Sequence, residues 1–247
     1  MANEYMAKST RKKSSSPSPL RSSAARRAVL RKWLPRLGFG LVGFVLFMVA
    51  LFSVINPPTT FYMQQESRRL GGVSQNWSDW DQIAPVMARS AVAAEDANFC
   101  LHWGFDMGAI RAAFDAGSNR GASTITQQVV KNVYLWHGRS WARKAMEAVL
   151  TPMVELLWSK TRILEVYLNV AEFGEGTFGI HAAAKRYFGT TPDKLTASQA
   201  ARLAAALPDP QNRNPAKPTD FMRRRANAIQ DGAATIRADG RAACFMD

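Results

Sequence analysis

Hydrophobic residues follow two different patterns along this chain. Residues 37–55 form a run of mostly apolar residues without a charge, and from residue 77 onwards apolar residues recur at the spacing of a helix face. An uncharged run of this length can cross a hydrocarbon core of roughly 30 Å. A repeat near 3.6 residues is typical of amphipathic helices. The pattern predicts a transmembrane helix over 37–55 followed by a mostly α-helical domain.

Capping residues mark where the helices of that domain begin. Thr124 with Gln127, and Thr196 with Gln199, match the capping box of a helix start. The predicted helices are 86–96 with Pro85 in its first turn, one starting at Ser123 or Thr124, 160–170 after Ser159, and 197–207. Pro152 is expected to kink the helix that follows residue 143. Short segments around 174–179 are the strand candidates.

Charge is concentrated before the apolar run. Residues 1–36 carry ten Lys or Arg against Glu4, which gives 10 − 1 = +9 of the chain's formal +13. Their Ser-rich, weakly hydrophobic composition predicts a disordered arm. A basic flank before a membrane span stays cytoplasmic, so the rest of the chain should lie outside. A nucleic-acid-binding arm is the alternative, and the position beside a span argues against it.

Breaker residues suggest the remaining boundaries. Pro57-Pro58 and Gly71-Gly72 predict a linker over 56–76, and the proline-rich stretch 210–218 could close a domain over 77–215. The basic segment 216–247 would then be a tail, either a solvated helix face or a contact for anionic lipid.

The two cysteines, Cys100 and Cys244, would face a disulfide-permissive compartment outside the membrane. Their pairing stays open, because two unpaired residues explain the sequence equally well. A bridge at Cys100 could also disturb the motif in which it lies.

The stretch 95–106, EDANFCLHWGFD, offers a candidate general base. Glu95 falls at the C-terminal end of a predicted helix, where the dipole disfavours negative charge. Phe99, Trp103 and Phe105 would add desolvation, and both effects raise the pKa of a carboxylate. Such a Glu suits proton abstraction at neutral pH. The alternative is a Glu95-Asp96 pair at a solvated helix end.

Two further stretches offer polar and cationic groups. In GASTITQQVVKN, Thr124, Gln128 and Lys131 share one helix face, and a helix N-terminus with free amides can bind phosphate. In RKAME, Arg143, Lys144 and Glu147 lie within about one turn. The alternatives are a capped helix with a solvated polar face and an exposed i,i+4 ion pair.

Other catalytic classes lack their signatures. The three histidines have no metal-ligand spacing, and no Gly-x-Ser-x-Gly elbow is present. Hydrolysis by a zinc site or a serine triad is therefore disfavoured.

Taken together, these stretches closely resemble the peptidoglycan glycosyltransferases of family 51, in their monofunctional branch. The resemblance covers about 83–215 and includes the three stretches above, KTRILEVYLNVAEFGEGTFGIHAAAKRYFG and LPDPQNRNP in order; no transpeptidase domain follows. It implies a lysozyme-like helical head and a membrane-associated jaw, preceded here by one transmembrane helix. The apolar residues available for the jaw are Phe105, Met107, Ile110 and Phe114. Cys100 and Pro152 depart from the family's pattern.

The same resemblance implies roles for individual residues. Glu95 would take the proton from the 4-hydroxyl of the acceptor, and Glu147 would assist at the donor pyrophosphate with Arg143 and Lys144. The positions implied to bind substrate or support the site are Asp96, Phe99, His102, Ser123, Thr124, Gln128 and Lys131. A divalent cation, Mg or Mn, is an optional aid at the pyrophosphate, and no organic cofactor is expected.

The implied reaction polymerises lipid II into β-1,4 glycan with inversion and releases undecaprenyl pyrophosphate. Expected partners are lipid II, the nascent glycan strand, membrane lipid and other cell-wall synthesis or division proteins, with no nucleic acid. The expected location is the bacterial inner membrane, with the catalytic domain periplasmic. Two rival readings remain: a lytic or lysozyme-like glycan-cleaving enzyme, and a non-catalytic cell-wall scaffold.

Overall fold

The computed structural model describes residues 19–117, 121, 123–138 and 140–246. It divides into two compact units, Met1–Phe47 and Met48–Asp247.

The first unit consists of most of helix α1, which runs from Pro19 to Phe52. Its stretch Arg31–Phe52 has a mean hydropathy of 2.0 and is long and apolar enough to cross a membrane. Its apolar side chains are exposed, as at Phe39. The helix already begins at Pro19, so the disorder expected over 19–36 is wrong for the backbone; the rest of the basic arm lies outside the described residues.

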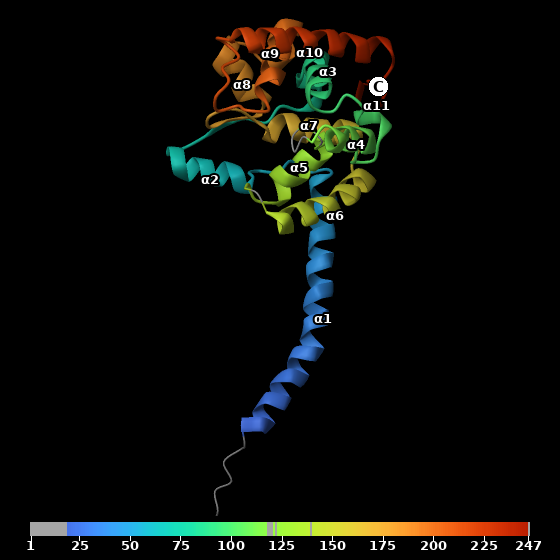
Figure 1. Cartoon of the computed structure of the whole chain (residues 1–247). Helices are drawn as coiled ribbons and strands as arrows, with labels where there is room; N and C mark the ends of the chain where they lie inside the picture. The colour runs from blue at the N-terminus through green and yellow to red at the C-terminus, as the bar shows by residue number, and fades with distance from the viewer. Residues whose placement is uncertain (1–18, 118–120, 122, 139, 247) are drawn as a thin grey trace, which may run out of the picture. The chain divides into compact units, whose positions relative to one another are not determined.

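The second unit is a helical domain with one small sheet (Figure 1). Its α-helices are α2 (Phe61–Leu70), α3 (Pro85–Glu95), α4 (Met107–Asp115), α5 (Ile125–Tyr134), α6 (Trp141–Leu157), α7 (Lys160–Val170), α8 (Gly179–Phe188), α9 (Ala197–Ala206), α10 (Asp220–Ala238) and α11 (Ala243–Met246). The 3-10 turns are η1 (Trp80–Gln82), η2 (Phe99–Leu101) and η3 (Pro192–Lys194).

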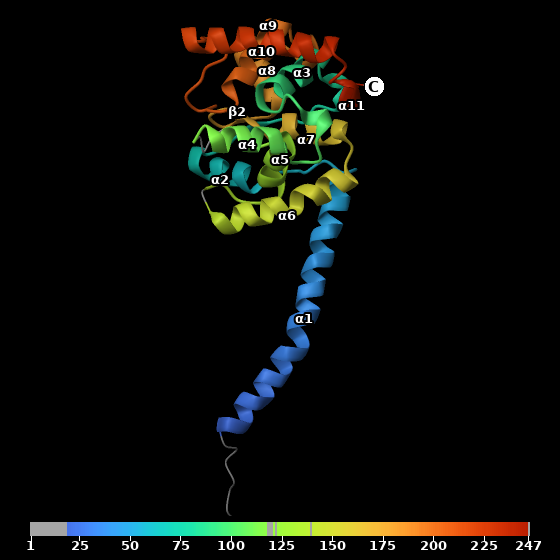
Figure 2. The same cartoon turned by 45° about the vertical axis from the view of Figure 1, so that its right-hand side comes forward.

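Helix α7 lies at the centre of this domain. Helices α3, α9 and α10 pack together on one side of it, and α5 and α6 lie on the other (Figures 1 and 2). Because α7 is covered from both sides, residues on every face of it are buried, including Ile163, Leu164 and Tyr167. The predicted amphipathic stripe of this helix is therefore part of a wider buried surface.

The sheet has three short strands in the order β1-β3-β2. Strands β2 (Glu172–Gly174) and β3 (Thr177–Phe178) are antiparallel and occupy the predicted strand region. Strand β1 (Ser74–Gln75) pairs parallel to β3 and comes from the stretch assigned to the linker.

The folded domain extends beyond both predicted boundaries, before residue 77 and after residue 215. Helix α2, in the expected linker, begins after Thr60, whose hydroxyl accepts from the Met63 amide, and ends at Gly71 in a left-handed conformation. Helix α10, in the expected tail, packs on α3 and α9 and buries Met222 and Ile229. The linker and the solvated tail are therefore wrong, since both segments belong to the helical core.

Local signals were more reliable. Thr124 and Thr196 form the predicted capping boxes, and Ser159 caps α7. Helix α3 ends at Glu95 as expected. Helix α6 continues through Pro152 as one helix. Cys100 and Cys244 form a disulfide, which closes the question that the sequence left open.

Candidate active site

Glu95 is the last residue of α3 and lies beside the polar face of α5. Gln128 Nε2 donates to Glu95 Oε2 at 2.9 Å, and Arg225 Nη2 lies 4.0 Å from Glu95 Oε1. Burial raises the pKa of Glu95, while the Gln128 hydrogen bond and the Arg225 charge oppose the rise. Trp103, expected to desolvate this carboxylate, is 70% exposed and lines a different cavity.

Two cavities meet at Gln128. One, of about 770 Å³, is lined by Glu95, Ser123, Arg213 and Arg225 among others. The other, of about 330 Å³, contains Lys131. Gln128 lines both, so the polar face of α5 connects the carboxylate to the next cavity along the helix.

The three polar residues of RKAME lie on the inner side of α6. Glu147 is 3% exposed, and its Oε2 accepts from Arg143 Nη1 at 2.7 Å. Its Oε1 is paired with Lys144 Nζ, which also reaches Ser123 Oγ at 3.4 Å. The alternative of an exposed i,i+4 pair is therefore wrong for Arg143 and Glu147.

Lys131 electrostatically links the two groups of charges. Burial lowers its pKa, with the charges of Glu147 and Glu95 raising it and those of Arg143 and Lys144 lowering it. The groups that act on Lys131 come from α3 and α6, at either side of α5. The three stretches singled out in the sequence thus lie together around α5.

Asp96 and His102 attach the segment after Glu95 to the start of α5. Asp96 is 7% exposed; its Oδ1 accepts from His102 Nε2 at 2.8 Å and its Oδ2 accepts from the Ile125 amide at 3.0 Å. Phe99, three residues further on, is fully buried in the core. Both Asp96 oxygens and His102 Nε2 are therefore paired within the protein, whereas the buried His102 Nδ1 has no hydrogen-bond partner among the described residues.

Thr124 likewise serves the fold. Its hydroxyl donates to the Gly104 carbonyl at 2.7 Å and accepts from the Gln127 amide. Gly104 has φ +79°, and a side chain there would overlap Thr151. The expectation of free amides at the start of α5 is wrong for Ile125 and Gln127, because buried donors take protein partners, here Asp96 and Thr124.

The charges around Glu147 do not form a metal-binding set. Both of its carboxylate oxygens are paired with cations of α6. Among the described residues, the group close enough to hold a metal is Asp96, His102 and Asp106, away from that pair. In this group, Asp106 Oδ1 accepts from the Ala109 amide and so caps α4, and Asp106 Oδ2 accepts from Asn98. A cation at the expected position would have to displace Arg143 or Lys144.

Several residues of these cavities were missed in the sequence. The 330 Å³ cavity is also lined by Tyr62, His137 and Glu172. Tyr62 donates to Glu172 Oε2 at 2.7 Å, and its ring stacks on His137 with centroids 3.6 Å apart. Tyr62 was hidden by the linker assignment, and Arg225 by the solvated-tail reading.

Comparison with known proteins identifies the class. The family model described as transglycosylase matches residues 63–234. The chain belongs to this family, and it is an enzyme of lysozyme-like helical fold rather than a scaffold.

The relatives narrow the class further. A biosynthetic peptidoglycan transglycosylase of Jannaschia sp. (strain CCS1) is 57% identical over 242 residues, covering 98% of this chain and 100% of the relative. Proteins with the same name from Caulobacter vibrioides and Stutzerimonas stutzeri are 42% and 44% identical, over 88% and 80% of this chain and 97% and 86% of their own. Within its family, the chain groups with the monofunctional biosynthetic peptidoglycan transglycosylases.

Proposed function

We propose that this transglycosylase polymerises lipid II into β-1,4 glycan strands and releases undecaprenyl pyrophosphate. One observation carries the proposal: Glu95 and the Arg143, Lys144 and Glu147 group lie at either side of α5, connected by Gln128 and Lys131. A displacement at a sugar carbon needs a base beside the attacking hydroxyl and cations beside the leaving group, and the two groups of residues match these needs.

In the proposed step, Glu95 takes the proton of the acceptor's 4-hydroxyl while that oxygen attacks the anomeric carbon of the donor. The bond from that carbon to the pyrophosphate oxygen breaks, and negative charge leaves with the pyrophosphate. Lys131, Arg143 and Lys144 are the cations available to stabilise it. A single displacement inverts the α-linked donor to a β-linked product, by analogy with inverting glycosidases. The site residues do not fit a divalent cation, and no step needs one.

The surface of α6 supports work at a membrane. Its charged side chains Arg143, Glu147 and Glu155 point into the domain, whereas Trp141 is 91% exposed and Leu156 is 71% exposed. The exposed positions along this helix are otherwise apolar or alanine, apart from the partly exposed Lys144. An outer face of this kind fits the acyl chains of a bilayer or of the lipid substrate.

The last turn of α1 is attached to this domain by hydrogen bonds. Trp158 Nε1 donates to the Val49 carbonyl at 2.8 Å, and Arg162 donates to the carbonyls of Phe52 and Ile55. Because Val49 and Phe52 end the apolar helix, the adjoining end of α6 should lie at the bilayer surface. With the basic arm cytoplasmic, the domain would face the periplasm from the inner membrane.

Glu95→Gln tests the proposal in the full chain in detergent with lipid II. We expect polymer from wild type, loss of polymerisation in Glu95→Gln, and unchanged activity in the control Glu175→Gln, an exposed carboxylate paired with Arg69. Because its folded pKa is raised, Glu95 becomes protonated, and activity falls, at a higher pH than for an ordinary Glu. Full polymerisation by Glu95→Gln would exclude it as the base. Glycan release from cell-wall sacculi without polymer would instead favour the lytic alternative.

A further inference from the structure

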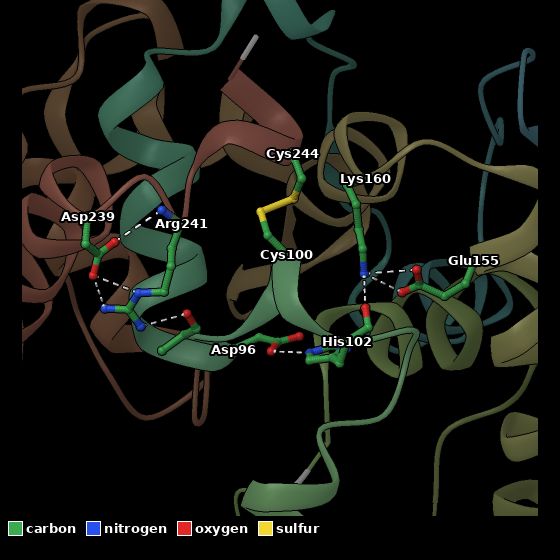
Figure 3. Close-up of a disulfide and its surroundings, with 9 residues drawn as sticks. Asp96, Cys100, His102, Glu155, Lys160, Asp239, Arg241 and Cys244 are labelled. Carbon is green, nitrogen blue, oxygen red and sulfur yellow. Dashed lines mark hydrogen bonds and ion pairs between the residues drawn. A yellow bond between two sulfur atoms is a disulfide. The ribbon is translucent and has the colours of Figure 1, made fainter.

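The disulfide joins two segments that are far apart in the sequence. Cys100 belongs to η2, just after the end of α3, and Cys244 belongs to α11, 144 residues later. Figure 3 shows the bridge standing between α11 and the turn that carries Asp96 and His102. The bridge therefore connects the C-terminal helix to the residues that follow Glu95.

Helix α11 is short and needs contacts with the rest of the domain. It has four residues, and isolated helices shorter than about 12 residues are marginal in water. It also packs on α7, Phe245 is buried against Phe99 with ring centroids 6.2 Å apart, and nearby Arg241 donates to the Ala97 carbonyl at 3.2 Å. The disulfide is the covalent tie among these contacts.

The turn on the other side of the bridge is closely packed. Lys160 Nζ lies 4.4 Å from the centre of the Phe99 ring and donates to the His102 carbonyl at 2.8 Å. The same ammonium pairs with Glu155, and the His102 ring donates to Asp96 (Figure 3). A displacement of Phe99 would therefore reach His102 and Asp96.

From Asp96 the connection continues to the base. Asp96 Oδ2 holds the Ile125 amide at the first turn of α5, and one turn further Gln128 donates to Glu95. Asp96 also follows Glu95 directly in the chain. The position of the turn therefore affects both partners of the hydrogen bond between Gln128 and Glu95.

We propose that the Cys100–Cys244 disulfide is a positioning bridge, which fixes the turn at 96–102 against α11 so that Asp96 holds α5, and with it Gln128, in register with Glu95. The inference rests on the proposed role of Glu95. Neither cysteine touches the reacting groups. Both are partly exposed, so a reductant can reach the bridge in the folded protein.

The test compares three forms of the full chain in detergent. These are oxidised wild type, wild type treated with a trialkylphosphine, and Cys100→Ala/Cys244→Ala. The phosphine supplies two electrons, water supplies the oxygen of the phosphine oxide, and the two sulfurs become thiols. The double variant has no bridge to reduce, so it also controls for other effects of the phosphine.

Below the melting temperature of every form, we expect kcat for lipid II polymerisation to fall roughly ten- to hundredfold without the bridge, with little change in KM. The fall of activity at acidic pH should also move to higher pH, because Glu95 loses the Gln128 hydrogen bond that lowers its pKa. Reoxidation of reduced wild type should restore both, and phosphine should leave the double variant unchanged.

A purely structural bridge gives a different result. A lower melting temperature with unchanged kcat and pH profile would overturn the inference, as would full activity in every form. If the double variant does not fold, reduced wild type is followed by circular dichroism and by activity; a loss of activity only in step with unfolding would also overturn it. Oxidised wild type that makes no polymer would instead contradict the proposed function.

Discussion

Asp96 is the residue whose removal should disturb the fold and the site together. Its carboxylate is 7% exposed and accepts one hydrogen bond from His102 and one from the Ile125 amide. Asp96→Ala leaves both donors without their partner, whereas Asp96→Asn keeps an oxygen for the Ile125 amide. The alanine variant should therefore be the more severe of the two.

The expected size follows from these two contacts. A hydrogen bond to a charged group contributes about 1.5–3 kcal/mol, and neighbouring contacts are not additive. We expect Asp96→Ala to lower the free energy of unfolding by about 3 kcal/mol and Asp96→Asn by about half of that. For a domain of this size, 3 kcal/mol corresponds to a fall in Tm of roughly 6–12 °C.

Thermal unfolding of the full chain in detergent, followed by circular dichroism, measures this effect. Asp231→Ala is the matched control, since Asp231 is exposed on α10. Polymerisation by Asp96→Asn below its melting temperature should also be reduced. Asp96 holds the start of α5, and Gln128 on that helix donates to Glu95. If Asp96→Ala melted within about 2 °C of wild type, the connection from the turn to α5 would be energetically unimportant.

Two further predictions concern the second cavity and the outer face of α6. Burial lowers the pKa of His137 to about 4, whereas in the unfolded chain it is about 6.5. Between about pH 6.5 and pH 4 the unfolded chain therefore binds a proton that the folded protein does not, and stability falls as the pH falls. Allowing for partial exposure, the loss should be about 1–2 kcal/mol in denaturant titrations at pH 7 and pH 4, and His137→Gln should remove it. Val149→Asp, at a position 59% exposed on α6, should keep the wild-type Tm but lower polymerisation in lipid vesicles, because a carboxylate is costly at an apolar interface. Asn227→Asp on the exposed face of α10 is its control, and equal activity of the two variants in vesicles would argue against lipid contact by α6.

The parts of the fold that could be predicted are those set by neighbouring residues. The capping box of α5 is written in Thr124 and Gln127, and it forms as predicted. The position of Glu95 at the end of α3 follows from equally local signals. Since helix boundaries place Glu95 and the start of α5, this part of the site could be singled out before its contacts were known.

What could not be predicted depends on distant partners. The buried stripe of α10 includes Met222, Ile229 and Ile236, but the helix also carries many charged residues, and the sequence does not show that its apolar face packs on α3 and α9. The Ile125 amide at the start of α5 is taken by Asp96, 29 residues earlier, which a helix pattern does not reveal. The linker reading gave weight to the breakers and overlooked Thr60, which caps α2.

The order in which the two cysteines are made has a consequence for biogenesis. Cys244 is synthesised 144 residues after Cys100, which at about 5–20 residues per second is a delay of roughly 7–30 s. The sequence contains two cysteines in all, so during that interval Cys100 has no partner in its own chain. Scrambled pairing within one molecule is therefore impossible, and the competing products are mixed disulfides with small thiols or with other chains. Maturation of this enzyme should accordingly depend more on thiol oxidation than on disulfide isomerisation.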